Sequence, residues 1–130
     1  MEKITAHLGQ EKFKTIINTA TNTLIADEPL ELEGKDLGFS PKELLTAALG
    51  SCTIITLKMY ANHKGWDLTD VKIEVTFDWI AETSKSVFTR KIELIGNLSD
   101  EQKERLLKIA DKCPVHKVLT NPTEIETSLI

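Results

Sequence analysis

The chain has 130 residues, of which 41% are hydrophobic and 28% charged, and its formal net charge is −4. This length suffices for one domain that buries a core without metals or structural disulfides, so we expect a single domain over residues 1–130. The negative charge argues against nucleic acid as a partner, because nucleic-acid binding needs a basic face. The charged N-terminal segment lacks the apolar run of a signal peptide, which favours a cytoplasmic location.

The first forty residues predict a meander of short strands. Apolar and polar residues alternate over residues 4–8, a glycine turn follows, and β-branched residues resume over 13–18 and 23–26. Glycine, proline and acidic residues then fill a connection over 26–42. We interpret this stretch as a loop within the domain.

A long helix is predicted next. Ser40 supplies a cap, Pro41 the first helical residue and Glu43 the partner of a capping box, while residues 44–57 carry no charge. This uncharged stretch is too short to span a bilayer, so we expect a central core helix and no membrane partner. The predicted buried face comprises Leu45, Ala48, Cys52, Ile55 and Met59.

The second half predicts a hairpin followed by helices. Alternation of period two indicates strands over 71–79 and 88–94, joined by a charged tip over 81–86. Ser99 begins another capping box, and its helix must end near Cys113, because Pro114 disfavours helical geometry in the preceding residue. A helical turn over 115–119 and a closing strand over 125–130 complete a predicted α+β fold.

The sequence has two cysteines in very different local settings. Cys52 lies in the middle of the long helix, where an inert core thiol is the simpler interpretation. Cys113 falls where one helix ends and another begins, so backbone N–H groups favour its thiolate, and His116 lies near it. These local arguments rank Cys113 as the more acidic thiol. In a reducing compartment any pairing of the two is expected to be transient and chemical.

Metal and serine-hydrolase chemistry have little support. Cys113 and His116 have C-x-x-H spacing, but Cys52, His7 and His63 supply no second clustered pair of ligands. No G-x-S-x-G motif is present, since Gly50-Ser51-Cys52 lies inside the predicted helix. We therefore expect no metal and no cofactor.

Two charged residues are further candidates for the site. Glu43 has a structural role as the capping partner of Ser40, and a catalytic role does not exclude it. Strand alternation places Arg90 on the apolar side with Phe88 and Ile92, where a buried arginine needs an anionic partner such as a thiolate or carboxylate. The alternative is a bulge that turns Arg90 to solvent.

Two segments of the sequence resemble the OsmC and organic hydroperoxide resistance (Ohr) proteins. The segments are SPKELLTAALGSC, ending at Cys52, and KCPVHKVL, which contains Cys113. This resemblance implies an OsmC-like α+β fold, with antiparallel strands around a long central buried helix, in an intertwined homodimer whose two active sites lie at the subunit interface.

The resemblance also implies a thiol peroxidase mechanism. The residue matching Cys52 attacks an organic hydroperoxide, the residue matching Cys113 resolves the sulfenic acid as a disulfide, and an external dithiol restores the thiols. This order reverses the local ranking of the two cysteines. The family's glutamate position holds Lys42, followed by Glu43, and no arginine precedes Arg90, so either Arg90 or Lys42 is the candidate substitute.

Two other functions stay open at this point. One is an OsmC-like protein that handles disulfides or responds to redox state, with peroxide as a poor substrate. The other is a non-enzymatic dimer that binds a small hydrophobic ligand and uses both cysteines only as core residues. The very apolar central helix favours a homodimer under each of these functions.

Overall fold

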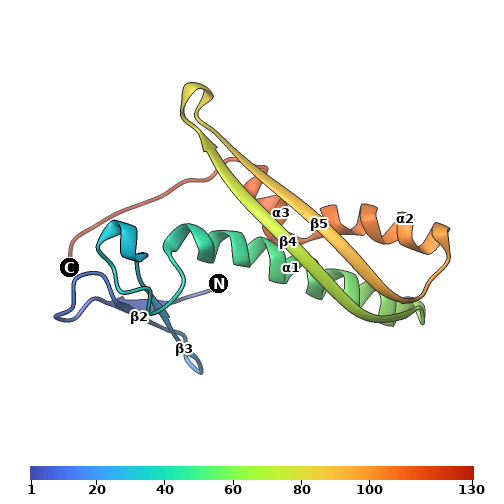
Figure 1. The fold of residues 1–130 in the computed structure, drawn as a ribbon, viewed down its shortest axis with the longest axis horizontal. Coiled ribbons are helices and arrows are strands. Elements are labelled where there is room, and N and C mark those ends of the chain that lie inside the picture. Colours follow the sequence, from blue (N-terminus) through green and yellow to red (C-terminus); the bar gives the residue numbers. More distant parts are fainter. The chain divides into compact units, whose positions relative to one another are not determined.

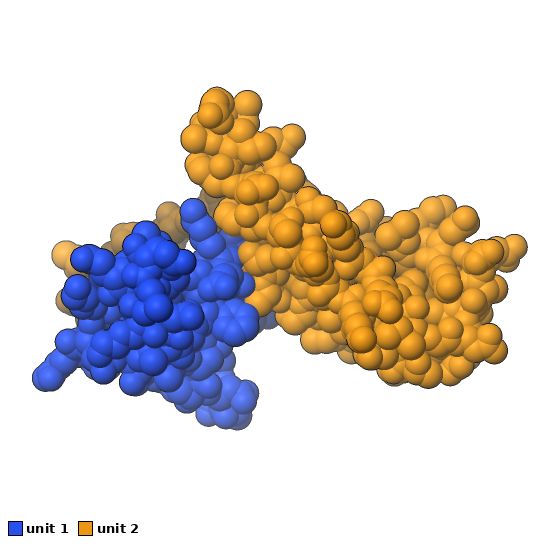
Figure 2. Space-filling model, viewed as in Figure 1, with its two compact units in different colours: residues 1–45 blue, residues 46–130 orange.

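The computed structural model describes all 130 residues. The chain divides into two compact units, residues 1–45 and residues 46–130, which are described separately (Figure 2). Three short strands precede the long helix α1, and a hairpin of two strands precedes the helices α2 and α3 (Figure 1). The predicted α+β class with antiparallel strands and one long helix is confirmed.

The N-terminal unit contains a three-stranded antiparallel meander. Its strands are β1 (Thr5–His7), β2 (Thr15–Asn18) and β3 (Thr23–Ala26), in that spatial order. Gly9 has a φ of 72°, which only glycine adopts without strain, and it opens the turn between β1 and β2. The predicted meander is confirmed, with β1 and β2 shorter than the alternation suggested.

A buried carboxylate organises the connection after β3. Asp27 is only 3% exposed. Its side chain accepts hydrogen bonds from the N–H groups of Glu28 (2.8 Å), Lys35 (3.3 Å) and Leu37 (3.2 Å). Burial raises the pKa of Asp27, but these three N–H groups and the charge of Lys35 outweigh it and hold the pKa below its ordinary value. Asp27 therefore fixes a loop that the sequence indicated only by its composition.

Helix α1 spans Pro41–Lys64. The predicted capping box is present, because the Ser40 N–H donates to Glu43 Oε1 at 2.9 Å and the Glu43 N–H donates to Ser40 Oγ at 3.3 Å. Gly65 ends the helix with a φ of 69°. Both ends of α1 thus lie where the sequence predicted them.

The buried face of α1 differs from the prediction. In the second unit, Ile55 and Met59 are 55% and 68% exposed. Within the single chain this part of the predicted stripe is not buried, because apolar residues surround the helix and spacings of three and four describe several overlapping stripes. The residues of α1 that are buried are Leu49, Gly50, Thr53, Leu57 and Ala61.

Strands β4 (Asp67–Ile80) and β5 (Lys85–Asn97) form one long antiparallel hairpin (Figure 1). A 3₁₀ turn, η2 (Ala81–Thr83), closes its tip. Gly50 of α1 faces β4, where an added Cβ would lie 3.3 Å from Val75 Cγ2. The glycine therefore lets the helix approach the sheet closely.

Two short helices complete the core of the second unit. Ser99 forms a full capping box with Gln102 and begins α2 (Asp100–Ile109), which continues into a 3₁₀ turn, η3 (Ala110–Lys112). Helix α3 (Pro114–Leu119) starts after Cys113, with the proline at its first position. The hydrophobic core joins α1, the hairpin and α2 through Leu57, Ala61, Leu68, Val71, Leu106, Ile109 and Ala110.

The predicted closing strand over 125–130 is wrong. Residues 122–130 have no regular secondary structure, and Ile125 and Leu129 are fully or almost fully exposed. Alternation measures only the propensity of a segment for extended backbone, and a strand also needs a neighbour to pair with. Within this chain, β4 and β5 pair only with each other.

Helix α1 is long and apolar enough to cross a membrane by length and composition. Its inner residues Leu57 and Ala61 lie in the core cluster with residues of the hairpin and α2. We therefore describe α1 as a core helix and not as a membrane span.

Candidate functional site

The structure brings Cys52 and Cys113 together. Cys52 lies in α1 and is partly exposed, whereas Cys113 lies between η3 and α3 and is 0% exposed. Both thiols are free, and they lie close enough for each to shift the pKa of the other. Residues 61 positions apart in the sequence thus share one site, which contains the two groups that a dithiol–disulfide cycle requires.

Hydrogen-bond donors surround the sulfur of Cys113. The His116 N–H donates to Cys113 Sγ at 3.4 Å. Burial raises the pKa of the Cys113 thiol, but the Cys52 thiol and the N–H groups of His116 and Val115 act in the opposite direction. The nearby Thr53 side chain has a smaller effect in the same direction, and together these groups hold the pKa of Cys113 below its ordinary value.

The surroundings of Cys52 raise the pKa of its thiol. Burial raises the pKa of the Cys52 thiol, and its interactions with Cys113 raise it further. The Val115 N–H and the Thr56 hydroxyl lower the pKa by less. The local environment therefore favours Cys113 as the more acidic thiol, as the local sequence arguments suggested.

Arg90 reaches from β5 into the same site. Its side chain is 14% exposed. Nη1 donates to Thr53 Oγ1 and to the Ala110 carbonyl, both at 3.0 Å, and Nη2 donates to Asp111 Oδ1 at 3.0 Å and to His116 Nδ1 at 2.9 Å. One guanidinium thus connects α1 to the segment on either side of Cys113.

The alternation argument placed Arg90 on the correct side of its strand. Arg90 pairs with Val75 in the ladder and shares the inner face of the hairpin with Ile92. The alternative of a bulge at Arg90 is wrong, because the irregularity in the ladder lies between Leu68 and Asp70. The partners of Arg90 are a carboxylate, a carbonyl, a hydroxyl and an imidazole.

Thr53 is the site residue that sequence reasoning missed. It is 0% exposed, and its hydroxyl donates to the Leu49 carbonyl at 2.7 Å while it accepts from Arg90. A threonine beside a cysteine in an apolar helix was the available signal, because a buried hydroxyl needs partners.

Glu43 takes part in the capping box of α1. The N–H and hydroxyl of Ser40 hold the pKa of Glu43 below its ordinary value, and the residue belongs to the N-terminal unit. Its structural role is confirmed, and its catalytic role stays a prediction. Lys42, the other substitute considered, is an exposed residue in the first turn of α1.

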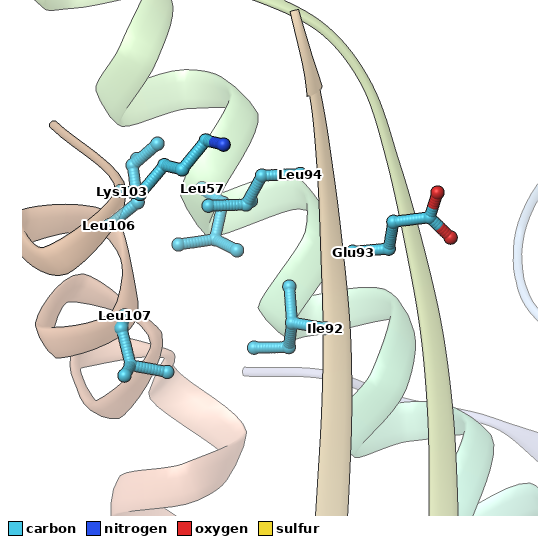
Figure 3. Close-up of a pocket in the computed structure, with 7 residues that line it drawn as sticks. All are labelled: Leu57, Ile92, Glu93, Leu94, Lys103, Leu106 and Leu107. Carbon is cyan, nitrogen blue, oxygen red and sulfur yellow. The ribbon is translucent and has the colours of Figure 1, made fainter. Parts of the chain in front are cut away.

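An apolar groove of about 380 Å³ lies between α2 and β5 (Figure 3). Figure 3 shows Leu57 and Leu94 pointing toward α2, with the Lys103 amine near them and Glu93 pointing away. Leu57 lies one turn beyond Thr53 in α1, so the groove is close to the thiol site along the helix. Its lining residues are Leu57, Ile92, Glu93, Leu94, Lys103, Leu106 and Leu107.

The fold and the site define a class of α+β proteins with two neighbouring free thiols. The OsmC-like protein family matches residues 34–128, and this chain belongs to that family. Among proteins of curated function, none matches the chain in sequence.

Solved structures show the same fold. A protein from Psychrobacter arcticus 273-4, described by its role in osmotic stress and detoxification responses, is 27% identical, with a TM-score of 0.75 over 90% of this chain and 85% of that one. An OsmC-like protein from Mycoplasma pneumoniae is 20% identical, with a TM-score of 0.77 over 92% and 86% of the two chains. An organic hydroperoxide resistance protein OsmC from Legionella pneumophila is 22% identical, with a TM-score of 0.68 over 92% and 89%.

Proposed function

We propose that this protein is a thiol peroxidase that reduces organic hydroperoxides to alcohols. The observation that carries the proposal is the pair of free thiols, Cys52 and Cys113, which lie close enough for each to shift the pKa of the other. Membership of the OsmC-like family and the fold of a hydroperoxide resistance protein support it.

In the proposed reaction, Cys52 attacks the distal oxygen of the hydroperoxide. The O–O bond breaks, the alcohol leaves, and Cys52 becomes a sulfenic acid. Cys113 then attacks the oxidised sulfur, and water and a disulfide form. An external dithiol reduces this disulfide, and the cytoplasm is the compartment that supplies such reductants. Cys52 is the attacking residue because its side chain is partly exposed, whereas Cys113 is fully buried.

The test is stopped-flow oxidation of the reduced protein by cumene hydroperoxide and by hydrogen peroxide. We expect the wild type to react faster with the organic peroxide and to form the Cys52–Cys113 disulfide, detected by non-reducing mass analysis. Cys52→Ser is expected to lose the reaction. A wild type that reacts no faster than free cysteine would defeat the proposal and favour disulfide handling, with the same thiol pair, as the function.

The groove between α2 and β5 favours a second candidate function, the binding of a small hydrophobic ligand. Its volume of about 380 Å³ lies within the range of small-molecule sites, and leucine and isoleucine side chains dominate its lining. Under this function Cys52→Ser keeps the affinity for a fluorescent apolar probe, whereas Leu107→Lys loses it. Probe binding that is absent in the wild type would eliminate this candidate.

We propose that the protein acts as a homodimer. Ile55 and Met59 of α1 and Trp79 of β4 leave large apolar side chains exposed, at 55%, 68% and 53%. A second copy of the chain would cover these surfaces by a symmetric interface. Sedimentation analysis should give a dimer for the wild type and a shift toward monomer for Ile55→Glu, with Lys72→Glu on the polar side of β4 as the control.

A further inference from the structure

The apolar groove between α2 and β5 is built on the core of the second unit. Leu57 of α1 lies at its base, and Leu57 and Leu106 are both fully buried in the core cluster (Figure 3). Ile92 and Leu94 of β5 are partly buried and pack against the same cluster. Because close-packed core side chains hold one arrangement, the groove of about 380 Å³ is a fixed feature of the fold.

Helix α2 contributes a cation and an apolar side chain to the groove. Lys103, Leu106 and Leu107 all line it, because residues three and four apart lie on one face of a helix. Leu107 is 64% exposed. Lys103 is exposed too and forms no ion pair with another residue of the chain. Its amine lies near Leu57 and Leu94 (Figure 3).

The acidic residue at the groove points away from it. Glu93 lies between Ile92 and Leu94 in β5, so strand alternation places its side chain on the opposite face of the hairpin, where its ladder partner is Lys72. Figure 3 shows this direction of the Glu93 carboxylate. Among the residues that line the groove, Lys103 therefore supplies the charge that a bound ligand meets.

An apolar groove with an ammonium group at its edge fits a small amphipathic anion. The alkyl chain of such a ligand is stabilised by leaving water for the leucine and isoleucine side chains. Its carboxylate stays at the exposed edge, where the flexible lysine side chain reaches it without burial of either charge. A ligand with a positive charge of its own would be repelled by the same ammonium.

We propose that this groove binds a small alkyl carboxylate, with the chain against Leu57, Leu94 and Leu107 and the carboxylate beside the Lys103 amine. This proposal rests on the second candidate function, ligand binding in the groove, and it names the chemical class of the ligand and the residue that selects it. No cysteine lines the groove, so the ligand binds there without reacting.

The test compares the binding of octanoate and of octylamine to the reduced full chain by titration calorimetry at neutral pH. The two probes have the same chain length and opposite charges. We expect the wild type to bind octanoate at least about threefold more tightly, as an exposed ion pair allows. Lys103→Glu should reverse this preference, because the repelled probe becomes the attracted one. An unchanged preference in Lys103→Glu would overturn the proposal.

Lys108→Glu is the matched control for Lys103→Glu. Lys108 is an exposed residue of the same helix and does not line the groove. The control changes the net charge by the same amount, so it measures the long-range effect of charge on both probes. We expect it to keep the preference for octanoate. An equal change in both variants would show that net charge selects the probe, and it would overturn the role of Lys103.

NMR spectra of protein labelled at leucine methyl groups locate the bound probe. Octanoate should shift the resonances of Leu57, Leu94 and Leu107 and leave those of Leu30 and Leu32, which are exposed in the N-terminal unit, unchanged. A second copy of the chain that covers the groove would instead give contacts between copies at these methyl groups and no response to octanoate. That result would overturn the proposal.

Two comparisons separate this proposal from the functions on which it builds or borders. If octanol binds the groove but octanoate does not, hydrophobic ligand binding stands and the selection of a carboxylate is defeated, whereas binding of neither probe defeats both. Cys52→Ser should keep the affinity for octanoate, and a loss of affinity would place the ligand at the thiol site and overturn the proposal. A wild type that binds octanoate but does not react with peroxide would defeat the peroxidase alone.

Discussion

The surroundings of Cys52 and Cys113 differ although the two thiols are neighbours. Cys52 lies inside a continuous helix, where the backbone N–H of each residue is already bonded to a carbonyl one turn away. Cys113 lies at the break between η3 and α3, where N–H groups of the first turn of α3 have no helical partner. The break between helices therefore places N–H groups beside Cys113 that oppose the effect of burial on its pKa, whereas at Cys52 burial has the larger effect.

Removing Arg90 should have the largest effect on the site that holds the two cysteines. Arg90→Met removes the arginine donor from the buried Thr53 hydroxyl and from Asp111, and leaves the Ala110 carbonyl with only the Cys113 N–H at 3.4 Å, so we expect a loss of about 2–4 kcal/mol in the free energy of unfolding, measured with urea. The thiolate fraction of Cys113 should fall in the same variant.

Arg105→Met is the matched control for Arg90. Arg105 is exposed and donates to Tyr60 Oη at 3.0 Å, so its loss should cost no more than about 1 kcal/mol. Equal losses for the two arginine variants would show that Arg90 does not organise the site.

Changing Gly50 should disturb the packing of α1 around Cys52 and leave the surroundings of Cys113 unchanged. Gly50→Leu forces α1 away from Val75, where even a Cβ would lie 3.3 Å from Cγ2, and we expect a loss of about 1–3 kcal/mol of unfolding free energy. Ser51→Leu, one residue later on an exposed position, should change stability little. The alkylation rate of Cys52 should change more than the titration of Cys113, and the opposite result would contradict the division between the two sides.

Removing the cap of α2 tests whether a change at the start of this helix reaches Cys113, which follows the end of η3. Ser99→Ala should cost about 1 kcal/mol, because the Gln102 N–H loses its acceptor at 3.1 Å. The thiolate fraction of Cys113 should stay as in wild type, since its donors are unaffected. Ser128→Ala, in the exposed C-terminal segment, provides the unchanged reference in thermal unfolding.

The smallest expected effect concerns Thr56, which hydrogen-bonds Cys52 and lowers its pKa. In a Cys113→Ser background, Thr56→Val should move the titration of Cys52 to higher pH. Alkylation at neutral pH then slows by about threefold or less, because burial is the larger influence on this thiol. A faster reaction in Thr56→Val would contradict the assignment of Thr56 as a donor.

The sequence was most informative where local chemistry decides the structure. The capping residues Ser40 and Ser99 and the prolines Pro41 and Pro114 predicted the beginning of each helix, because caps and prolines act within one turn. The alternation around Arg90 likewise predicted its side of the hairpin.

Long-range packing was harder to predict. The buried face of α1 depends on where the hairpin and α2 lie, so Thr53 was missed while Ile55 was expected to be buried. The role of Thr53 also depends on Arg90, which is 37 residues away in the sequence. The predicted strand over 125–130 failed for the same reason, since pairing requires a neighbour that no local pattern specifies.

The carboxylate of Asp27 makes the loop after β3 sensitive to acid. Because its pKa is lowered in the folded loop, its stabilising contribution is complete at neutral pH and disappears as the pH falls through that lowered pKa. Protonation weakens the bonds from Glu28, Lys35 and Leu37 together, since all three depend on one side chain. Residues 28–37 should therefore open as one cooperative segment in acid, and they should be cut by an acid protease before the rest of the chain is.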